Sequence, residues 1–217
     1  MRVHYFILLL LATITISCST SNTKMTGQWA NKEKLQNKDI NSVFIAVLSS
    51  NMDAKTTLED ELAYQAGMRG ITAIKSHRVF TRTFTKDNTP SKQELLSAIR
   101  ATNADVIFTV TLQDKESSTR YVPGRTAYYP MGYGYYGNFY GYYSNMYPVM
   151  YDPGYYTTDK IYYIESNLYD AATEELLWSA QSSTYNPSNL ENFVKGYTEA
   201  LLKQLEKDGI IQPMDTK

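Results

Sequence analysis

The feature that most restricts the fold is a regular alternation of apolar runs and capped helical segments between residues 40 and 212. Residues 42–48 form a nearly continuous apolar run, which is typical of a strand covered on both faces. Four further strands are predicted from the chain pattern, at residues 71–80, 105–112, 160–168 and 176–184. A polar connection of hairpin type joins the last two.

Three helices are predicted from apolar residues at helical spacing, and each begins with a Ser/Thr-x-x-Glu capping box. The boxes are Thr56/Glu59, Ser91/Glu94 and Ser188/Glu191, at the starts of helices over 56–69, 91–102 and 188–208. Gly70, Asn103 and Gly209 are expected to end these helices, the first two in the left-handed conformation, and Ile210-Ile211 to fold back behind the last. The order β-α-β-α-β-β-β-α predicts an α/β (α+β) fold, with a mixed sheet and helices packed against it.

The amino terminus has the pattern of a secreted lipoprotein precursor. Behind Arg2, residues 5–16 are apolar apart from two threonines, and this run is shorter than the about 20 residues that cross a bilayer. The segment ends in Thr15-Ile16-Ser17-Cys18, which resembles the bacterial lipobox except that threonine stands where leucine is usual. The alternatives are an ordinary signal peptide with a chance cysteine and an uncleaved amino-terminal anchor.

The lipobox resemblance implies a lipid anchor on Cys18. Residues 1–17 are then a signal peptide, and Cys18 carries a diacylglycerol thioether and an acyl chain such as palmitate on its amino group. No aspartate follows Cys18 and residues 19–24 contain no acidic run, so we expect a periplasm-facing lipoprotein of the outer membrane. Residues 18–39 are predicted to be the lipidated cysteine and a flexible tether with a span of about 25 Å, in which Trp29 is the one large apolar residue.

Composition limits the chemistry of the predicted domain, residues 40–212. The chain has 21 Lys and Arg residues against 22 Asp and Glu, a balance that gives no general attraction to nucleic acid. Cys18 is the only cysteine, so once it carries lipid there is no thiol for a disulfide or a metal. We expect no cofactor and no metal.

A tyrosine- and glycine-rich insertion, residues 121–158, separates the third and fourth predicted strands. It holds 13 of the 20 tyrosines, within residues 121–156, and a loop of this length in a compact domain is functional or disordered. One interpretation is a loop with no dedicated ligand. Another is a binding surface for an envelope protein or cell-wall glycan, since tyrosine offers an apolar face and a hydroxyl. A third is contact with a membrane or self-association. The candidate binding residues are Tyr128, Tyr129, Tyr133, Tyr135, Tyr136, Tyr140, Tyr142 and Tyr143.

No set of residues predicts a catalytic site. His77 is expected to face solvent on the second strand, and no nucleophile elbow accompanies it. The carboxylates at 53 and 59–61 are interpreted as favourable charges at a helix start. Residues 132–137 fit the spacing G-x-G-x-x-G, but no strand precedes them and no helix follows, so a dinucleotide site is not predicted. We therefore expect a protein that is not an enzyme.

The assembled elements resemble a broad group of bacterial envelope lipoproteins. The resemblance lies in the first strand, in the segment Ala101-Thr102-Asn103-Ala104-Asp105-Val106-Ile107, and in the hairpin motif formed by Asp170, Thr173, Leu177, Trp178 and Ser179. The group includes the curli-secretion pore lipoprotein and the outer-membrane activators of penicillin-binding proteins. Glu174 departs from the group, because glycine is usual at this turn position. Trp178 is expected to pack in the core.

The sequence thus favours a non-enzymatic outer-membrane lipoprotein that binds or scaffolds an envelope component through its tyrosine-rich insertion. A self-associating structural protein of the envelope is the alternative, followed by an envelope hydrolase.

Overall fold

The computed structural model describes residues 22–81, 90–122 and 155–214. In order, its elements are β1 (Thr23–Ala30), α2 (Lys32–Gln36), β2 (Ser42–Leu48), α3 (Met52–Gly67), β3 (Thr72–Lys75), α4 (Ser76–Val79), α5 (Lys92–Arg100), β4 (Val106–Val122), β5 (Tyr155–Asp170), β6 (Leu176–Tyr185) and α7 (Leu190–Lys207). The mixed α/β fold class is confirmed.

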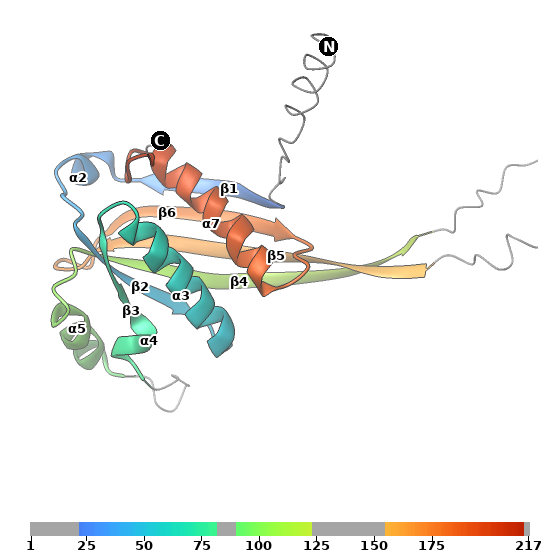
Figure 1. Cartoon of the computed structure of the whole chain (residues 1–217), viewed down its shortest axis with the longest axis horizontal. Helices are drawn as coiled ribbons and strands as arrows, with labels where there is room; N and C mark the ends of the chain where they lie inside the picture. Colours follow the sequence, from blue (N-terminus) through green and yellow to red (C-terminus); the bar gives the residue numbers. More distant parts are fainter. Residues whose placement is uncertain (1–21, 82–89, 123–154, 215–217) are drawn as a thin grey trace, which may run out of the picture.

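The strands form one six-stranded sheet in the order β1-β6-β5-β4-β2-β3. β2 is parallel to both β3 and β4, and the other neighbouring pairs are antiparallel. Figure 1 shows α3 and α7 side by side across one face of this sheet. The described sheet is therefore mixed, as predicted, and its two long helices share a face.

The main core lies between the sheet and these two helices. Alternate residues of the strands point into it, among them Ile45, Phe108 and Trp178, and Tyr197 and Leu201 of α7 meet them. A smaller cluster on the other face joins the β2–β4 region to α5, and its buried members are Phe44, Ile99, Ile107 and Ala171. Trp178 is fully buried, which confirms its predicted core position.

The tether prediction was wrong for residues 23–36. Thr23–Ala30 pairs antiparallel with β6, the Thr23 and Thr184 hydroxyls lie 2.8 Å apart, and α2 follows with Asn31 as its N-cap. β1 lies at the edge of the sheet and α7 packs on one of its faces, so the strand buries few residues. Met25 and Ala30 pack partly buried against the core, whereas Trp29 is half exposed. A polar composition therefore did not distinguish this edge strand from a coil.

Two predicted helix starts and one predicted strand also differ. α3 is capped by Asn51 and α7 by Asn189, whose side-chain oxygens accept bonds from Ala54 and Asn192, so only the Ser91/Glu94 box is formed among the described helices. The predicted strand over 71–80 ends at Lys75, and residues 76–79 form the short α4. In α4, Ser76 and His77 donate hydrogen bonds to the Glu59 carboxylate, which points into the interior.

The predicted chain reversals are confirmed. Gly70, Asn103 and Gly209 have φ angles of 74°, 56° and 72°. Glu174 also has a positive φ, of 64°, and its N–H donates to the carbonyl of Asp170. The turn before β6 therefore places a glutamate in the conformation that glycine adopts most easily.

The limits of the tyrosine-rich insertion change in the structure. β4 continues to Val122 and β5 begins at Tyr155, so residues 121–122 and 155–158 belong to strands and not to a loop. Residues 123–154, with all eight candidate tyrosines, lie outside the described part, as does Cys18. In the described part, no helix is long and apolar enough to cross a bilayer.

Candidate functional site

β4 and β5 extend well past the strands beside them. They pair continuously from Val106↔Asp170 to Val122↔Tyr155, with one register shift between Leu112 and Asp114. The β2 pairing ends at Thr111 and the β6 pairing ends at Ile161. Residues 117–122 and 155–160 therefore form a two-stranded ribbon, called the arm here, which Figure 1 shows projecting from the body. Residues 123–154 connect its two strands.

The root of the arm is fastened to the body by polar contacts. The Asp159 carboxylate accepts bonds from Arg120 Nε at 2.8 Å and from Asn186 Nδ2 at 2.7 Å. Hydrogen bonds from the Tyr185 hydroxyl and from Asn186 lower the pKa of Asp159. Lys115 lies 5.5 Å above the ring of Tyr162. The bonds from Asn186 and Tyr185 join the arm to the body, whereas the Arg120 and Lys115 contacts join β4 to β5. Because a free two-stranded ribbon is marginally stable in water, both kinds of contact help to hold the arm in position.

A groove of about 430 Å³ opens beside the arm root, between the first turns of α3 and α7. The rings of Tyr162 and Phe193 form an edge-to-face pair in it, with centroids 5.8 Å apart. Leu48 and Leu112 line it and are 57% and 48% exposed. The domain thus exposes large apolar side chains at the end from which the arm projects.

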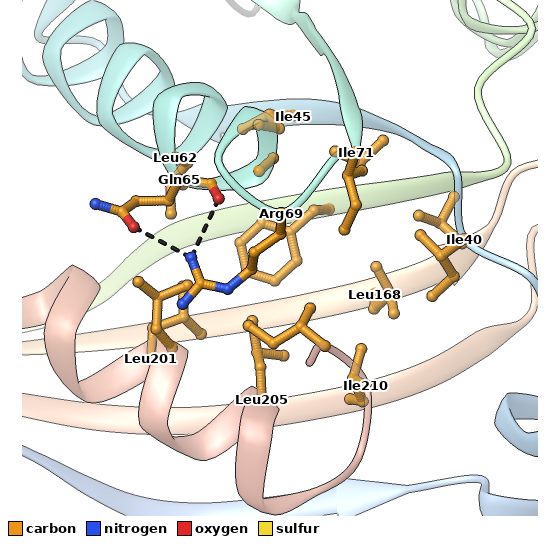
Figure 2. Close-up of a pocket in the computed structure, with 16 residues that line it drawn as sticks. Ile40, Ile45, Leu62, Gln65, Arg69, Ile71, Leu168, Leu201, Leu205 and Ile210 are labelled. Atoms are coloured by element: carbon orange, nitrogen blue, oxygen red, sulfur yellow. Dashed lines mark hydrogen bonds between the residues drawn. The ribbon is translucent and has the colours of Figure 1, made fainter. Parts of the chain in front are cut away.

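A second cavity lies inside the body, between α3, α7 and the sheet. Figure 2 shows the Arg69 guanidinium reaching into it, with hydrogen bonds at 3.2 Å to the carbonyl and the side-chain oxygen of Gln65. Arg69 also pairs with Glu206 at 2.9 Å, while its Nε has no partner within the described residues. The cavity measures about 80 Å³, well below the about 150 Å³ of an apolar cavity that holds benzene. We interpret it as imperfect packing.

Glu59, Ser76 and His77 form a polar cluster that the sequence did not predict. The Glu59 carboxylate is fully buried and accepts bonds from Val47 N at 3.0 Å, Ser76 Oγ at 2.6 Å and His77 N at 3.0 Å, with His77 Nδ1 at 2.7 Å. Assigning Glu59 to helix-start electrostatics and His77 to solvent was wrong. The Ser76 hydroxyl donates to the carboxylate and is buried, so it is not activated by His77 as a nucleophile would be.

The structure brings together residues that the sequence did not connect. Leu48, Leu112, Tyr162 and Phe193 come from three strands or strand ends and one helix, and only the register of the sheet places them in one groove. Their apolar character was visible in the sequence, but a core position explained it equally well. Among the described residues, no three His, Asp or Glu side chains are grouped as metal ligands.

Comparisons with known proteins give distant structural likeness only. No protein-family model and no curated protein sequence matches the chain. Similar solved structures include a PelC variant dodecamer from Paraburkholderia phytofirmans, with 13% identity, coverage of 82% of this chain and 94% of that chain, and a TM-score of 0.41. Lipoprotein GNA1162 from Neisseria meningitidis has 10% identity, coverage of 76% and 98%, and a TM-score of 0.41. The LpoB C-terminal domain from Escherichia coli has 11% identity, coverage of 71% and 94%, and a TM-score of 0.33. Likeness at these scores carries no inference about partner, assembly or activity.

Proposed function

We propose that this chain is a non-enzymatic lipoprotein of the bacterial outer membrane that binds or scaffolds another envelope component. Lipid on Cys18 holds it in the membrane, and the arm presents the tyrosine-rich residues 123–154 to the partner. The arm is the observation that carries this proposal. The 32 residues from 123 to 154 could be connected without a ribbon of this length. A ribbon that holds a binding segment away from the body makes that segment more accessible to a partner.

The interior supports a binding role over catalysis. The polar cluster around Glu59 is satisfied by its own hydrogen bonds, and the cavity beside Arg69 is about 80 Å³. Neither offers a substrate both access and an activated nucleophile. Self-association is the second candidate, favoured by the two strand edges that the arm leaves without a neighbouring strand in the described part of the chain.

Removing the tyrosine-rich segment tests the binding role. Val122 and Tyr155 are opposed across the ladder, so residues 123–154 can be replaced by an Asn-Gly turn that closes the arm as a hairpin. We expect an unchanged circular dichroism spectrum and the loss of in-cell crosslinks to envelope components, because the segment makes the contact. The crosslinked partners are identified by pull-down and mass spectrometry.

A length-matched control separates aromatic contact from loop length. It replaces all eight candidate tyrosines by serine and keeps the segment. Loss of crosslinks in both variants supports recognition through the tyrosines, and full retention in the deletion variant contradicts the proposal. Sedimentation of both variants over a range of concentrations shows whether the lost partner was a second copy.

Cys18→Ala tests the anchor. We expect the substitution to abolish palmitate labelling and to move the protein from the membrane to the soluble periplasmic fraction, because no other residue can accept the lipid. Cell fractionation with labelled fatty acid measures both effects. Cys18→Ser, which keeps a small polar residue but also lacks the thiol, should give the same result. A Cys18→Ala protein that stays bound to the membrane would contradict the lipoprotein assignment.

A further inference from the structure

The anchored end of the chain enters the domain beside the arm. The described part begins at Asn22, whose carbonyl oxygen accepts a hydrogen bond of 3.0 Å from the N–H of Tyr185. Tyr185 is the last residue of β6 and pairs with Ile161, where the arm leaves the body. Figure 1 shows the start of β1 at the same end of the sheet as the arm. We call this the arm end of the domain.

The connection between this end and Cys18 is short. Only residues 19–21 separate Cys18 from Asn22, and four residue steps span at most about 14 Å when fully extended. The tether predicted from sequence, 18–39, is shortened because residues 23–36 belong to β1 and α2. The polar layer on each side of a bilayer is about 5–8 Å thick. The arm end therefore lies within contact distance of the membrane that holds the lipid.

The arm end is chemically suited to a lipid surface. Leu48, Met52 and Leu112 are 57%, 40% and 48% exposed there. Exposed apolar side chains that gather in one place mark an interaction site. Polar residues surround them: Ser49, Asn51, Ser188 and Asn189 at the starts of α3 and α7, and the cationic Lys160 of β5. An apolar centre with a polar rim fits the boundary between acyl chains and headgroups.

We infer that the arm end docks on the surface of the bilayer that holds the Cys18 lipid, with Leu48, Met52 and Leu112 in contact with lipid. The inference rests on the anchoring in the proposed function. It deepens that function, because the arm then lies at membrane level. The partner of the tyrosine-rich segment is accordingly a component at the membrane surface.

α3 offers two matched positions for a test. Met52 opens the helix at the arm end and Met68 caps its other end, and both are exposed methionines. They are sixteen residue steps apart, a distance of about 24 Å along the helix. Because acylation occupies Cys18, Met52→Cys or Met68→Cys adds the only free thiol, which can carry an environment-sensitive fluorophore. The labelled mature lipoprotein is reconstituted in phosphatidylethanolamine–phosphatidylglycerol vesicles that contain a brominated lipid.

Flotation of the vesicles comes first, and only floated protein is measured. We expect severalfold stronger quenching by brominated lipid at position 52 than at position 68, with emission shifted to shorter wavelength. Leu48→Ser with Leu112→Ser should reduce this quenching, and Tyr64→Ser, at a distant exposed position on α3, should leave it unchanged. Equal quenching at the two positions overturns the inference while leaving the anchor intact. Failure to float overturns the anchoring instead. A shift at position 52 without lipid quenching shows that protein covers the surface, which also overturns the inference.

Discussion

Trp178→Ala is expected to lower the free energy of unfolding by about 3–5 kcal/mol, the range seen when a buried large aromatic residue is truncated. Trp178 is fully buried and stacks on Phe108, with ring centroids 6.4 Å apart. Its Nε1 donates to Asp208 Oδ2 at 2.8 Å, at the C-cap of α7. The substitution therefore opens a cavity and also releases the end of the helix that covers the sheet. Urea unfolding of the soluble Cys18→Ala chain measures the change.

Two variants separate the parts of the Trp178 effect. Trp178→Phe keeps most of the buried area and loses the bond to Asp208, so its cost should be about 1–2 kcal/mol. Asp208→Asn keeps an acceptor oxygen and should cost less than either tryptophan substitution. A cost of less than about 1 kcal/mol for Trp178→Ala would contradict the core position, because this is within the range of surface substitutions and mild repacking.

Glu59→Ala is expected to destabilise the protein by about 3 kcal/mol or more, because it leaves several buried donors without an acceptor. The donors are the backbone N–H groups of Val47 and His77, the Ser76 hydroxyl and the His77 ring. These contacts join β2, α3 and α4, so their loss should also free the edge of the sheet at β3. Urea unfolding measures the stability, and hydrogen exchange of residues 72–79 reports the local opening.

Two substitutions on the same helix control for this result. Glu59→Gln has nearly the same shape, but its amide group brings a donor against donors, so it should recover only part of the loss. Glu61→Ala removes a carboxylate whose described hydrogen-bond partner is Gln65 of the same helix, and should cost less than about 0.5 kcal/mol. Equal effects at positions 59 and 61 would show that the buried cluster contributes little.

Local signals predicted much of the fold. The apolar run at 42–48, the capping box at Ser91 and the reversals at Gly70 and Asn103 depend on neighbours a few residues away, and all are present. Other elements could not be recognised locally. β1 exists because β6 supplies its hydrogen bonds, and the buried Glu59 carboxylate is satisfied by Ser76 and His77, 17 and 18 residues further along the chain. A polar segment or a charged residue carries no mark of such distant partners.

The candidate site also has parts that local sequence predicts and parts that depend on distant contacts. The sequence by itself determined the lipobox-like pattern on which the prediction of a leader over residues 1–17 rests, the composition of the tyrosine-rich segment and its place between two strands, because these are properties of consecutive residues. Only the tertiary structure decided that the strands on either side of this segment form an arm and that the described chain begins, at Asn22, beside that arm. It also decided that Leu48 and Leu112 are exposed at that end. These depend on the register of strands far apart in the chain, which is set when the core packs and not by any short segment.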